Sequence, residues 1–210
     1  MKGIKELLEE YKRKKHAIKK RLKEFRAVLK ANDRTLFGEL CFCILTPQSK
    51  AINCDRAIRE LSGEDLLRSG SAVSIRKTLR KLVRFHNNKA AYIVGARRPF
   101  SCLDIKNMVK THSTFDVREW IVKNIKGLGY KEASHFLRNI GLGKDLAILD
   151  RHILKNLKRY GAIEHVPPSI SRKTYLAVEG KMREFCNAIE IPLEELDLLF
   201  WSQETGVIFK

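Results

Sequence analysis

The sequence has few cysteines, and none of them is spaced for metal binding. Five cysteines occur among 210 residues, and the two nearest in sequence, Cys41 and Cys43, are separated by one residue. An odd number without any CxxC pair argues against a complete disulfide framework, a zinc finger or a four-cysteine iron–sulfur loop. We therefore interpret the cysteines as small buried hydrophobic residues, and we expect no metal and no cofactor.

Long apolar segments are also absent. No run approaches the ~20 residues that span a bilayer. The segment from Met1 to Lys15 is charged from the start and lacks the apolar core of a signal peptide. We therefore expect a cytoplasmic protein with no membrane partner.

Acidic residues are scarce relative to basic ones. Twenty-four Asp and Glu stand against 42 Lys and Arg, which gives a formal net charge of +18. Such a surplus favours a polyanionic partner, because basic residues gathered on one surface release condensed counterions from nucleic acid. An anionic membrane surface is the alternative partner. Within the cytoplasm, the charge favours a place on the nucleoid.

Alternating strand patterns are almost missing, and apolar positions three and four residues apart predict helices throughout. Residues 3–30 have an amphipathic pattern with a strongly basic outer face, and Leu36 to Leu45 is apolar on nearly all sides, as in a buried helix. Only Val207 to Phe209 could form a strand. No repeat or low-complexity linker divides the chain. The predicted fold class is all-α, with further helices near residues 48–61, 64–69, 72–84, 87–96 and 102–110.

Three predicted helix boundaries depend on a cap or a proline. The pair Thr46-Pro47 predicts the start of the helix at 48–61, with Thr46 as its N-cap and Pro47 in its first turn. The pair Arg98-Pro99 predicts a helix end. Asp116 is predicted to cap the helix VREWIVKNI that follows it.

The residues that carry chemistry lie between Ile125 and Ile153. Gly127 and Gly129 flank Leu128 between two predicted helices, where glycine permits a tight turn with positive φ at both positions. The turn leaves free N–H groups at the start of the following helix, and together with the helix dipole they suit a phosphate. A plain packing role is the alternative, since such turns also join helices that bind nothing.

Lys131 and Asp150 favour the functional interpretation. Lys131 lies two residues after Gly129, and Asp150 follows nineteen residues later, after the apolar stretch Leu146–Leu149. Taken singly, Lys131 could be a solvated or phosphate-contacting cation, and Asp150 could be a simple N-cap. The two residues together, at this spacing after one Gly-x-Gly hairpin, arise by chance much less often than either residue alone.

The segment 125–153 resembles the core of the helix-hairpin-helix DNA glycosylase superfamily. The family pattern is a Gly-x-Gly hairpin, a lysine in bifunctional members and an aspartate after a glycine-rich loop. The matching residues here are Gly127, Gly129, Lys131, Gly141, Gly143 and Asp150. The segment LTPQSKAINCDRA is similar to the family helix that carries a glutamine facing DNA. Length, the missing cysteine cluster and the ending WSQETGVIFK resemble the compact 8-oxoguanine glycosylase/lyase subfamily of archaea and some thermophilic bacteria, the second Ogg class.

This resemblance implies a two-lobed helical fold with the DNA cleft between the lobes. It implies neither an iron–sulfur cluster nor the N-terminal β-domain of the eukaryotic-type enzyme. We expect residues 1–210 to form a single catalytic unit. One lobe would comprise about 1–47 plus 150–210, and the other about 48–149, which contains the helix-hairpin-helix at 116–140.

The implied reaction starts with extrusion of the damaged nucleotide, because a base inside the duplex cannot be attacked at its sugar. Lys131 would attack C1′ as a neutral amine, which requires desolvation and neighbouring cations, and β-elimination from the Schiff base would cut the strand. Asp150 would stay ionised and stabilise the cationic sugar. The hairpin at Gly127, Gly129 and Tyr130 would hold phosphates near the lesion.

Four further positions are candidate site residues. Gln48 could fill the gap left by the extruded nucleotide, or it could be a polar residue in a first turn. Phe85 or Trp201 could stack on the base, although an ordinary core position is the favoured interpretation of Phe85 and an equal one for Trp201. The resemblance implies that the terminal Lys210 contributes to the lesion site, and the apolar run before it indicates that the tail docks.

Other aromatic and histidine residues are interpreted as structural. Phe115, Trp120 and Phe136 recur on a helical face, as core residues do. His135, four residues after Lys131, could touch DNA, but a core or surface position is favoured.

We therefore predict a monomeric 8-oxoguanine DNA glycosylase and AP lyase whose partner is double-stranded DNA containing oxidised guanine. One alternative is a glycosylase of the same fold for another damaged or mismatched base. Relatives specific for pyrimidines commonly carry the cysteine cluster that is missing here. A second alternative is a non-catalytic hairpin that only holds DNA; Lys131 together with Asp150 argues against it, because a binding module does not need the carboxylate.

Overall fold

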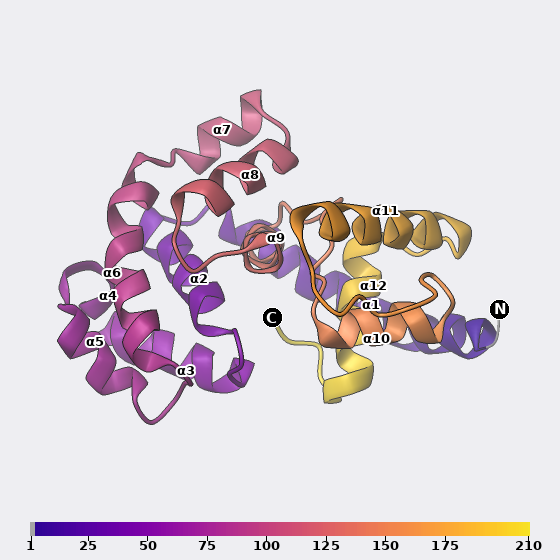
Figure 1. The fold of residues 1–210 in the computed structure, drawn as a ribbon, viewed down its shortest axis with the longest axis horizontal. Coiled ribbons are helices and arrows are strands. Elements are labelled where there is room, and N and C mark those ends of the chain that lie inside the picture. Colours follow the sequence, from indigo (N-terminus) through magenta and orange to yellow (C-terminus); the bar gives the residue numbers. More distant parts are fainter. Residues whose placement is uncertain (1–2) are drawn as a thin grey trace.

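The computed structural model describes residues 3–210, and every regular element in that range is a helix. The predicted all-α fold is confirmed, and the possible strand at Val207–Phe209 is not formed. Figure 1 shows α2 to α8 in one group, α10 to α12 in another and α9 between them. The helices are α1 (Ile4–Val28), α2 (Asp33–Leu45), α3 (Ala51–Gly63), α4 (Leu66–Ser69), α5 (Ala72–Leu79), α6 (His86–Cys102), α7 (Ile105–Thr111), α8 (Thr114–Asn124), α9 (Tyr130–Asn139), α10 (Arg151–Arg159), α11 (Arg172–Ala188) and α12 (Leu193–Thr205).

Side-chain caps fix several helix starts. Asn32, Ser71 and Ser171 each accept a hydrogen bond from a backbone N–H in the first turn of their helix. At α8 the N-cap is Ser113, whose hydroxyl oxygen accepts from the Asp116 N–H at 3.2 Å, while the Asp116 carboxylate accepts from the Ser113 N–H at 3.1 Å. The prediction that Asp116 is the N-cap is therefore wrong, because this reciprocal capping box places it inside the first turn.

The helix start predicted at Thr46-Pro47 is also wrong. Thr46 ends α2, and its hydroxyl donates back to the Cys43 carbonyl at 2.9 Å. A hydroxyl that bonds to the preceding turn does not cap the next helix. Helix α3 begins only at Ala51, and the intervening turn leaves Gln48 exposed with a φ of 54°.

Helix α6 continues through Pro99, where the pair Arg98-Pro99 predicted an end. Its last residue is Cys102. Phe100 is buried, and its ring centroid lies 5.1 Å from that of Phe37 in α2. Burial of this aromatic ring outweighs the backbone hydrogen bond that is lost at the proline.

The cysteines are dispersed through the helices. Cys41, Cys43, Cys54 and Cys186 are buried, as interpreted, whereas Cys102 is exposed. Burial raises the pKa of the Cys54 thiol to about 11. Within residues 3–210 no group of His, Cys, Asp or Glu side chains is arranged to hold a metal ion, and none of the helices is long and apolar enough to cross a bilayer.

Buried apolar side chains form two clusters. The first contains residues between 36 and 146, and the second joins α1 to residues between 147 and 200. The lobe bounds predicted near residues 47 and 149 stay a prediction. The buried side chains of α2 belong to the first cluster, however, which favours a boundary between α1 and α2. The chain passes from one cluster to the other just before Asp150.

Helix α9 lies between the two clusters and contacts both (Figure 1). Phe136 belongs to the first cluster. Arg138 is buried, pairs with Asp197 of α12 at 3.3 Å and lies with its guanidinium 4.9 Å from the centroid of Phe25 in α1. Burial raises the pKa of the Asp197 carboxyl to about 6, and the Arg138 charge opposes that shift. The helix that carries Lys131 is thus anchored on both sides.

Gly141 follows α9 at a position that only glycine fits. Its φ is 81°, and an added Cβ would lie 2.4 Å from the Cα of Arg26. Gly141→Ala should lower the free energy of unfolding by roughly 2–4 kcal/mol, through left-handed strain and a backbone clash with α1. Urea denaturation followed by circular dichroism measures this change.

Gly180→Ala in α11 is the matched control, because nothing lies within 4 Å of its added Cβ. It should leave the free energy of unfolding unchanged or raise it by up to about 1 kcal/mol, since alanine favours helices. Equal effects of the two substitutions would contradict the close contact between Gly141 and α1.

Candidate active site

Helices α8 and α9 form a hairpin around the buried side chain of Leu128. Gly127 has a φ of 94°, and a Cβ there would lie 2.5 Å from the Tyr92 ring, so the turn requires glycine. Gly129 has an extended backbone, with a φ of −91°, and is the N-cap of α9. Positive φ, which glycine permits at both positions, is therefore adopted by Gly127 and not by Gly129.

Lys131, the second residue of α9, pairs with its neighbour Glu132. The Lys131 Nζ lies 2.9 Å from Glu132 Oε1, and the side chains are 26% and 14% exposed. The other carboxylate oxygen, Oε2, accepts a hydrogen bond from the Gly129 N–H at 3.2 Å. Glu132 thus braces the hairpin and is the counter-ion of the predicted nucleophile. Glu132 is not among the residues predicted from the sequence, although its place three residues after the N-cap is the spacing of a capping box.

Asp150 is the N-cap of α10, as predicted. Its Oδ1 accepts hydrogen bonds from the N–H groups of His152 and Ile153, both at 2.8 Å. Within residues 3–210 the other oxygen, Oδ2, accepts none of the described hydrogen bonds. The helix dipole stabilises the negative charge at this end of α10. Asp150 is therefore held rigidly with one oxygen free for a ligand.

A cavity of about 280 Å³ lies beside Lys131. It is lined by Gly129, Tyr130, Lys131, Glu132, Leu149, Ile170 and Tyr175. Because Leu149 directly precedes Asp150, Lys131 and the segment of Asp150 meet at this cavity. A larger cavity of about 820 Å³, among α2, α4, α6 and α7, contains none of the predicted site residues.

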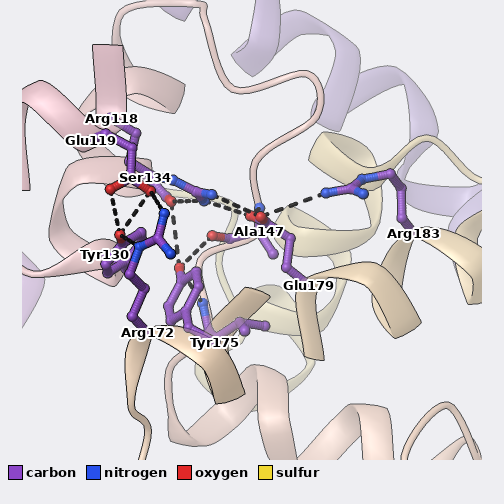
Figure 2. Close-up of polar contacts among 10 residues, drawn as sticks. Arg118, Glu119, Tyr130, Ser134, Ala147, Arg172, Tyr175, Glu179 and Arg183 are labelled. Carbon is purple, nitrogen blue, oxygen red and sulfur yellow. Dashed lines mark hydrogen bonds and ion pairs between the residues drawn. The ribbon is translucent and has the colours of Figure 1, made fainter. Parts of the chain in front are cut away.

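A buried network joins α9, which carries Lys131, to the segment before Asp150 (Figure 2). Arg118 of α8 and Glu179 of α11 are each 1% exposed and form a bidentate pair, with N–O distances of 2.6 and 2.9 Å. Arg118 Nη1 also donates to the Ser134 hydroxyl of α9 at 3.1 Å. Glu179 Oε1 accepts from the Ala147 N–H at 2.8 Å. The pair therefore links α9 to the segment that ends at Asp150.

Tyr175 completes this network. Its hydroxyl donates to the Ala147 carbonyl at 2.6 Å and accepts from the Leu149 N–H at 3.4 Å. Burial raises the pKa of the Tyr175 phenol, which keeps the hydroxyl protonated and able to donate. Helix α11 thus holds the backbone on both sides of Ile148, directly before Asp150.

The side chain of Tyr130 has partners inside the protein. Its hydroxyl donates to Glu119 at 2.6 Å and accepts from Arg172 Nε at 2.6 Å, and its ring centroid lies 5.4 Å from that of Tyr175 (Figure 2). Burial and the Glu119 carboxylate raise the Tyr130 pKa. The predicted phosphate contact of Tyr130 would therefore come from its backbone N–H in the first turn of α9.

The aromatic candidates differ in exposure. Phe85 is 54% exposed and has a left-handed backbone with a φ of 57°. The core interpretation of Phe85 is wrong, because the chain turns at this residue before α6 begins and its ring points out of the core. Trp201 is half-buried, with its ring centroid 5.4 Å from that of His152. Both rings keep surface on which a base could stack.

The C-terminal tail docks between the two groups of helices (Figure 1). Lys210 Nζ lies 2.7 Å from Glu39 of α2, 3.3 Å from Asp55 of α3 and 4.9 Å from the centroid of the Phe42 ring. The Phe209 carbonyl accepts a hydrogen bond from α1. The contribution of Lys210 to the lesion site stays a prediction.

The residues interpreted as structural are only partly in the core. Phe136 is buried, Trp120 is half-buried and Phe115 is exposed, so the core interpretation of Phe115 is wrong. His135 is buried, and its Nε2 has no hydrogen-bond partner in the described part of the chain. Burial holds the His135 pKa well below its usual value.

These features match one protein family. The model of the family described as Ogg-HhH, 8-oxoguanine DNA glycosylase, matches residues 18–191. The chain belongs to the 8-oxoguanine DNA glycosylase family. The family predicted from the hairpin is thereby confirmed.

Relatives in this glycosylase family are similar over nearly their whole length. The 8-oxoguanine DNA glycosylase/AP lyase of Fusobacterium nucleatum is 47% identical, over 95% of this chain and 94% of the relative. The corresponding protein of Methanocaldococcus jannaschii is 40% identical, over 93% of each. The names of both relatives include the DNA glycosylase and the AP lyase activity. The predicted enzyme class, a DNA glycosylase with AP lyase activity, is thereby confirmed.

Solved structures of the family have the same fold. The 8-oxoguanine DNA glycosylase of Thermotoga maritima has a TM-score of 0.89 at 35% identity, covering 99% of this chain and 98% of that one. The glycosylase/lyase of Methanocaldococcus jannaschii, in complex with 15mer DNA containing 8-oxoguanine, has a TM-score of 0.90 at 38% identity and covers 100% of both chains.

Removal of one member of the buried pair tests the network. In Arg118→Met, Glu179 stays buried and keeps the Ala147 N–H, but the cation nearest to it is then Arg183, at 3.5 Å. We expect the free energy of unfolding to fall by roughly 3–5 kcal/mol, because a buried charge loses its main partner. The double variant Arg118→Met/Glu179→Leu removes both charges and should lose less. Urea denaturation compares the variants, and a double variant less stable than the single one would contradict this account.

Proposed function

We propose that this protein excises 8-oxoguanine from duplex DNA and cuts the strand at the resulting abasic site, with Lys131 as the nucleophile. The observation that carries the proposal is the shared cavity: Lys131 and Leu149, next to Asp150, line one space where the two groups of helices meet. The printed names of the relatives, and a DNA complex of a close structural match, support the choice of lesion.

Duplex DNA binds first through the hairpin. The N–H groups of Gly127 and Tyr130, next to the positive end of α9, hold phosphate oxygens and fix the register of the duplex. Gly129 supports them through the turn, since its own N–H donates to Glu132. The damaged nucleotide is then extruded, and its base stacks on Phe85 or Trp201. In this proposal Gln48 fills the gap in the duplex, and Lys210 contributes to recognition of the base.

The chemistry requires Lys131 to lose a proton. Glu132 Oε1, 2.9 Å away, is placed to accept it. The amine then attacks C1′ as the bond from C1′ to the base breaks, and the base leaves with the bonding electrons and takes up a proton. Asp150 stabilises the positive charge that develops on the sugar. The C1′–O4′ bond of the adduct then breaks, with O4′ taking up a proton and the nitrogen losing one, and this gives the Schiff base. Loss of a C2′ proton then expels the 3′ phosphate.

One chain supplies the whole site, which supports a monomer. The hairpin, Lys131, Asp150 and the docked tail all belong to the same copy. Light scattering on the protein, free and with one equivalent of duplex, should give the mass of a single chain in both samples.

Borohydride trapping tests the nucleophile and the lesion together. Wild-type protein should form a covalent adduct with a duplex that carries 8-oxoguanine opposite cytosine, because borohydride reduces the Schiff base. Lys131→Gln should form none while it still binds the duplex. An adduct with Lys131→Gln would refute the nucleophile. Parallel duplexes carry thymine glycol, uracil or an abasic site, and trapping on the abasic site alone would mean that the lesion is a different one.

Glu132→Gln tests the pair beside the nucleophile. The substitution keeps an oxygen that can accept from the Gly129 N–H, but it removes the negative charge next to Lys131. Because Glu132 is placed to accept the proton that Lys131 loses, this substitution should slow single-turnover cleavage of a preformed abasic site by roughly tenfold or more. Glu184→Gln, an exposed residue of α11, is the charge-matched control and should leave the rate unchanged. An unchanged rate for Glu132→Gln would contradict the role given to the pair.

A further inference from the structure

Lys89 is a buried ammonium group that the reaction above does not use. It is 4% exposed, in the first turn of α6, and within residues 3–210 no carboxylate pairs with it. Its Nζ donates to the carbonyls of Leu45 and Pro47, both at 2.7 Å, and to the Ser49 hydroxyl at 2.9 Å. These acceptors use all three donors of the ammonium. We call this arrangement the Lys89 clamp.

The clamp encloses the turn that carries Gln48, and Lys89 follows the turn that carries Phe85. Both of these residues have left-handed backbones, with φ of 54° and 57°. Residues with a Cβ rarely adopt this conformation, so the surrounding structure must hold them in it. Both side chains are exposed.

Ser49 and Lys89 couple the two turns. The Ser49 hydroxyl oxygen accepts a hydrogen bond from the Arg84 N–H at 3.0 Å in addition to the one from Lys89. The Lys89 N–H bonds to the Phe85 carbonyl at 3.1 Å. A shift of either turn would therefore break bonds to the other, and the two exposed side chains share one support.

A buried charge that supports a turn has a large desolvation cost. An uncharged side chain of similar length would fill the space without the desolvation of an ammonium group. Burial lowers the pKa of Lys89 to about 8; the Cys54 thiol opposes this shift, and the charge of Lys131 adds to it. Unlike an apolar side chain, the ammonium provides three directed bonds around the turn of Gln48, two to backbone carbonyls and one to the Ser49 hydroxyl.

We propose that Lys89 is a positioning residue for nucleotide extrusion, which presents Gln48 and Phe85 to DNA as one rigid unit. A side chain that is already held in its bound conformation does not have to be ordered when DNA binds. The inference rests on the proposed function, because it assumes that Gln48 and Phe85 act on DNA during extrusion.

The test compares a reaction that needs extrusion with one that does not. Lys89→Met removes the donors and keeps the length of the side chain. It should slow single-turnover excision of 8-oxoguanine from a duplex by tenfold or more, since small misplacements of positioning groups have large effects on rate. Cleavage of a preformed abasic site in single-stranded DNA should change less than about threefold, because no nucleotide has to leave a duplex.

Two further variants separate positioning from folding and from charge. Ser49→Ala removes one acceptor of the clamp with little change of volume and should show the same selective loss, even if Lys89→Met fails to fold. Lys110→Met, at an exposed site on α7, removes one positive charge outside the clamp and should leave both rates unchanged. Equal losses in both reactions, or no loss in either, for Lys89→Met and Ser49→Ala would overturn the proposal.

A fluorescence measurement keeps this inference separate from the proposed function. 2-Aminopurine next to the lesion brightens when its neighbour leaves the stack, whether or not any bond is cut. If the wild-type protein extruded the lesion but did not excise it, the proposed reaction would be refuted. The fluorescence of Lys89→Met would still decide the role of Lys89 in extrusion. Loss of brightening in Lys89→Met, and no further loss in Lys89→Met/Gln48→Ala, is the expected result. Normal brightening in Lys89→Met would overturn it.

Discussion

The buried pair of Arg118 and Glu179 is the interaction on which the arrangement of the site depends. Arg118 lies in α8, in the first group of helices, and Glu179 lies in α11, in the second. Arg118 also bonds to α9 through Ser134, and Glu179 also bonds to the backbone at Ala147. An ion pair without access to water is weak evidence for stability, because desolvation opposes the attraction. Its value here is geometric, since two charges with directed hydrogen bonds hold α9, the helix of Lys131, in place against the segment before Asp150.

Charged and polar groups hold the rest of the site in the same way. Glu132 braces the hairpin with one oxygen and pairs with Lys131 through the other. Lys89 holds the turn of Gln48, and Lys210 ties the tail to α2 and α3. In a chain with a net charge of +18, only part of the basic surplus is available to attract phosphates. Several of the most buried basic groups position the backbone instead.

The sequence was sufficient for features that depend on local spacing. Glycine, lysine and aspartate in register predicted the hairpin and the Asp150 cap, and helical periodicity predicted the fold class. The sequence was insufficient where contacts between residues far apart in the chain determine the structure of the site. Arg118 and Glu179 are 61 positions apart and Lys89 and Pro47 are 42 apart, so no local pattern reveals them. Local rules also failed at Phe85, whose surrounding pattern is typical of a core helix although the chain turns there before α6 and the ring is exposed.

The identity of the amine that bonds to DNA is the central claim, and three lysines in this part of the molecule make it testable. The charge of Lys131 acts on buried Lys89, and Lys210 docks against α2 and α3. The measurement is peptide mapping by mass spectrometry of the borohydride-reduced adduct on 8-oxoguanine duplex, after digestion of protein and DNA. We predict that the sugar remnant is attached to Lys131. Attachment to Lys89 or Lys210 would contradict the account and assign the chemistry to a group to which we give a positioning or recognition role.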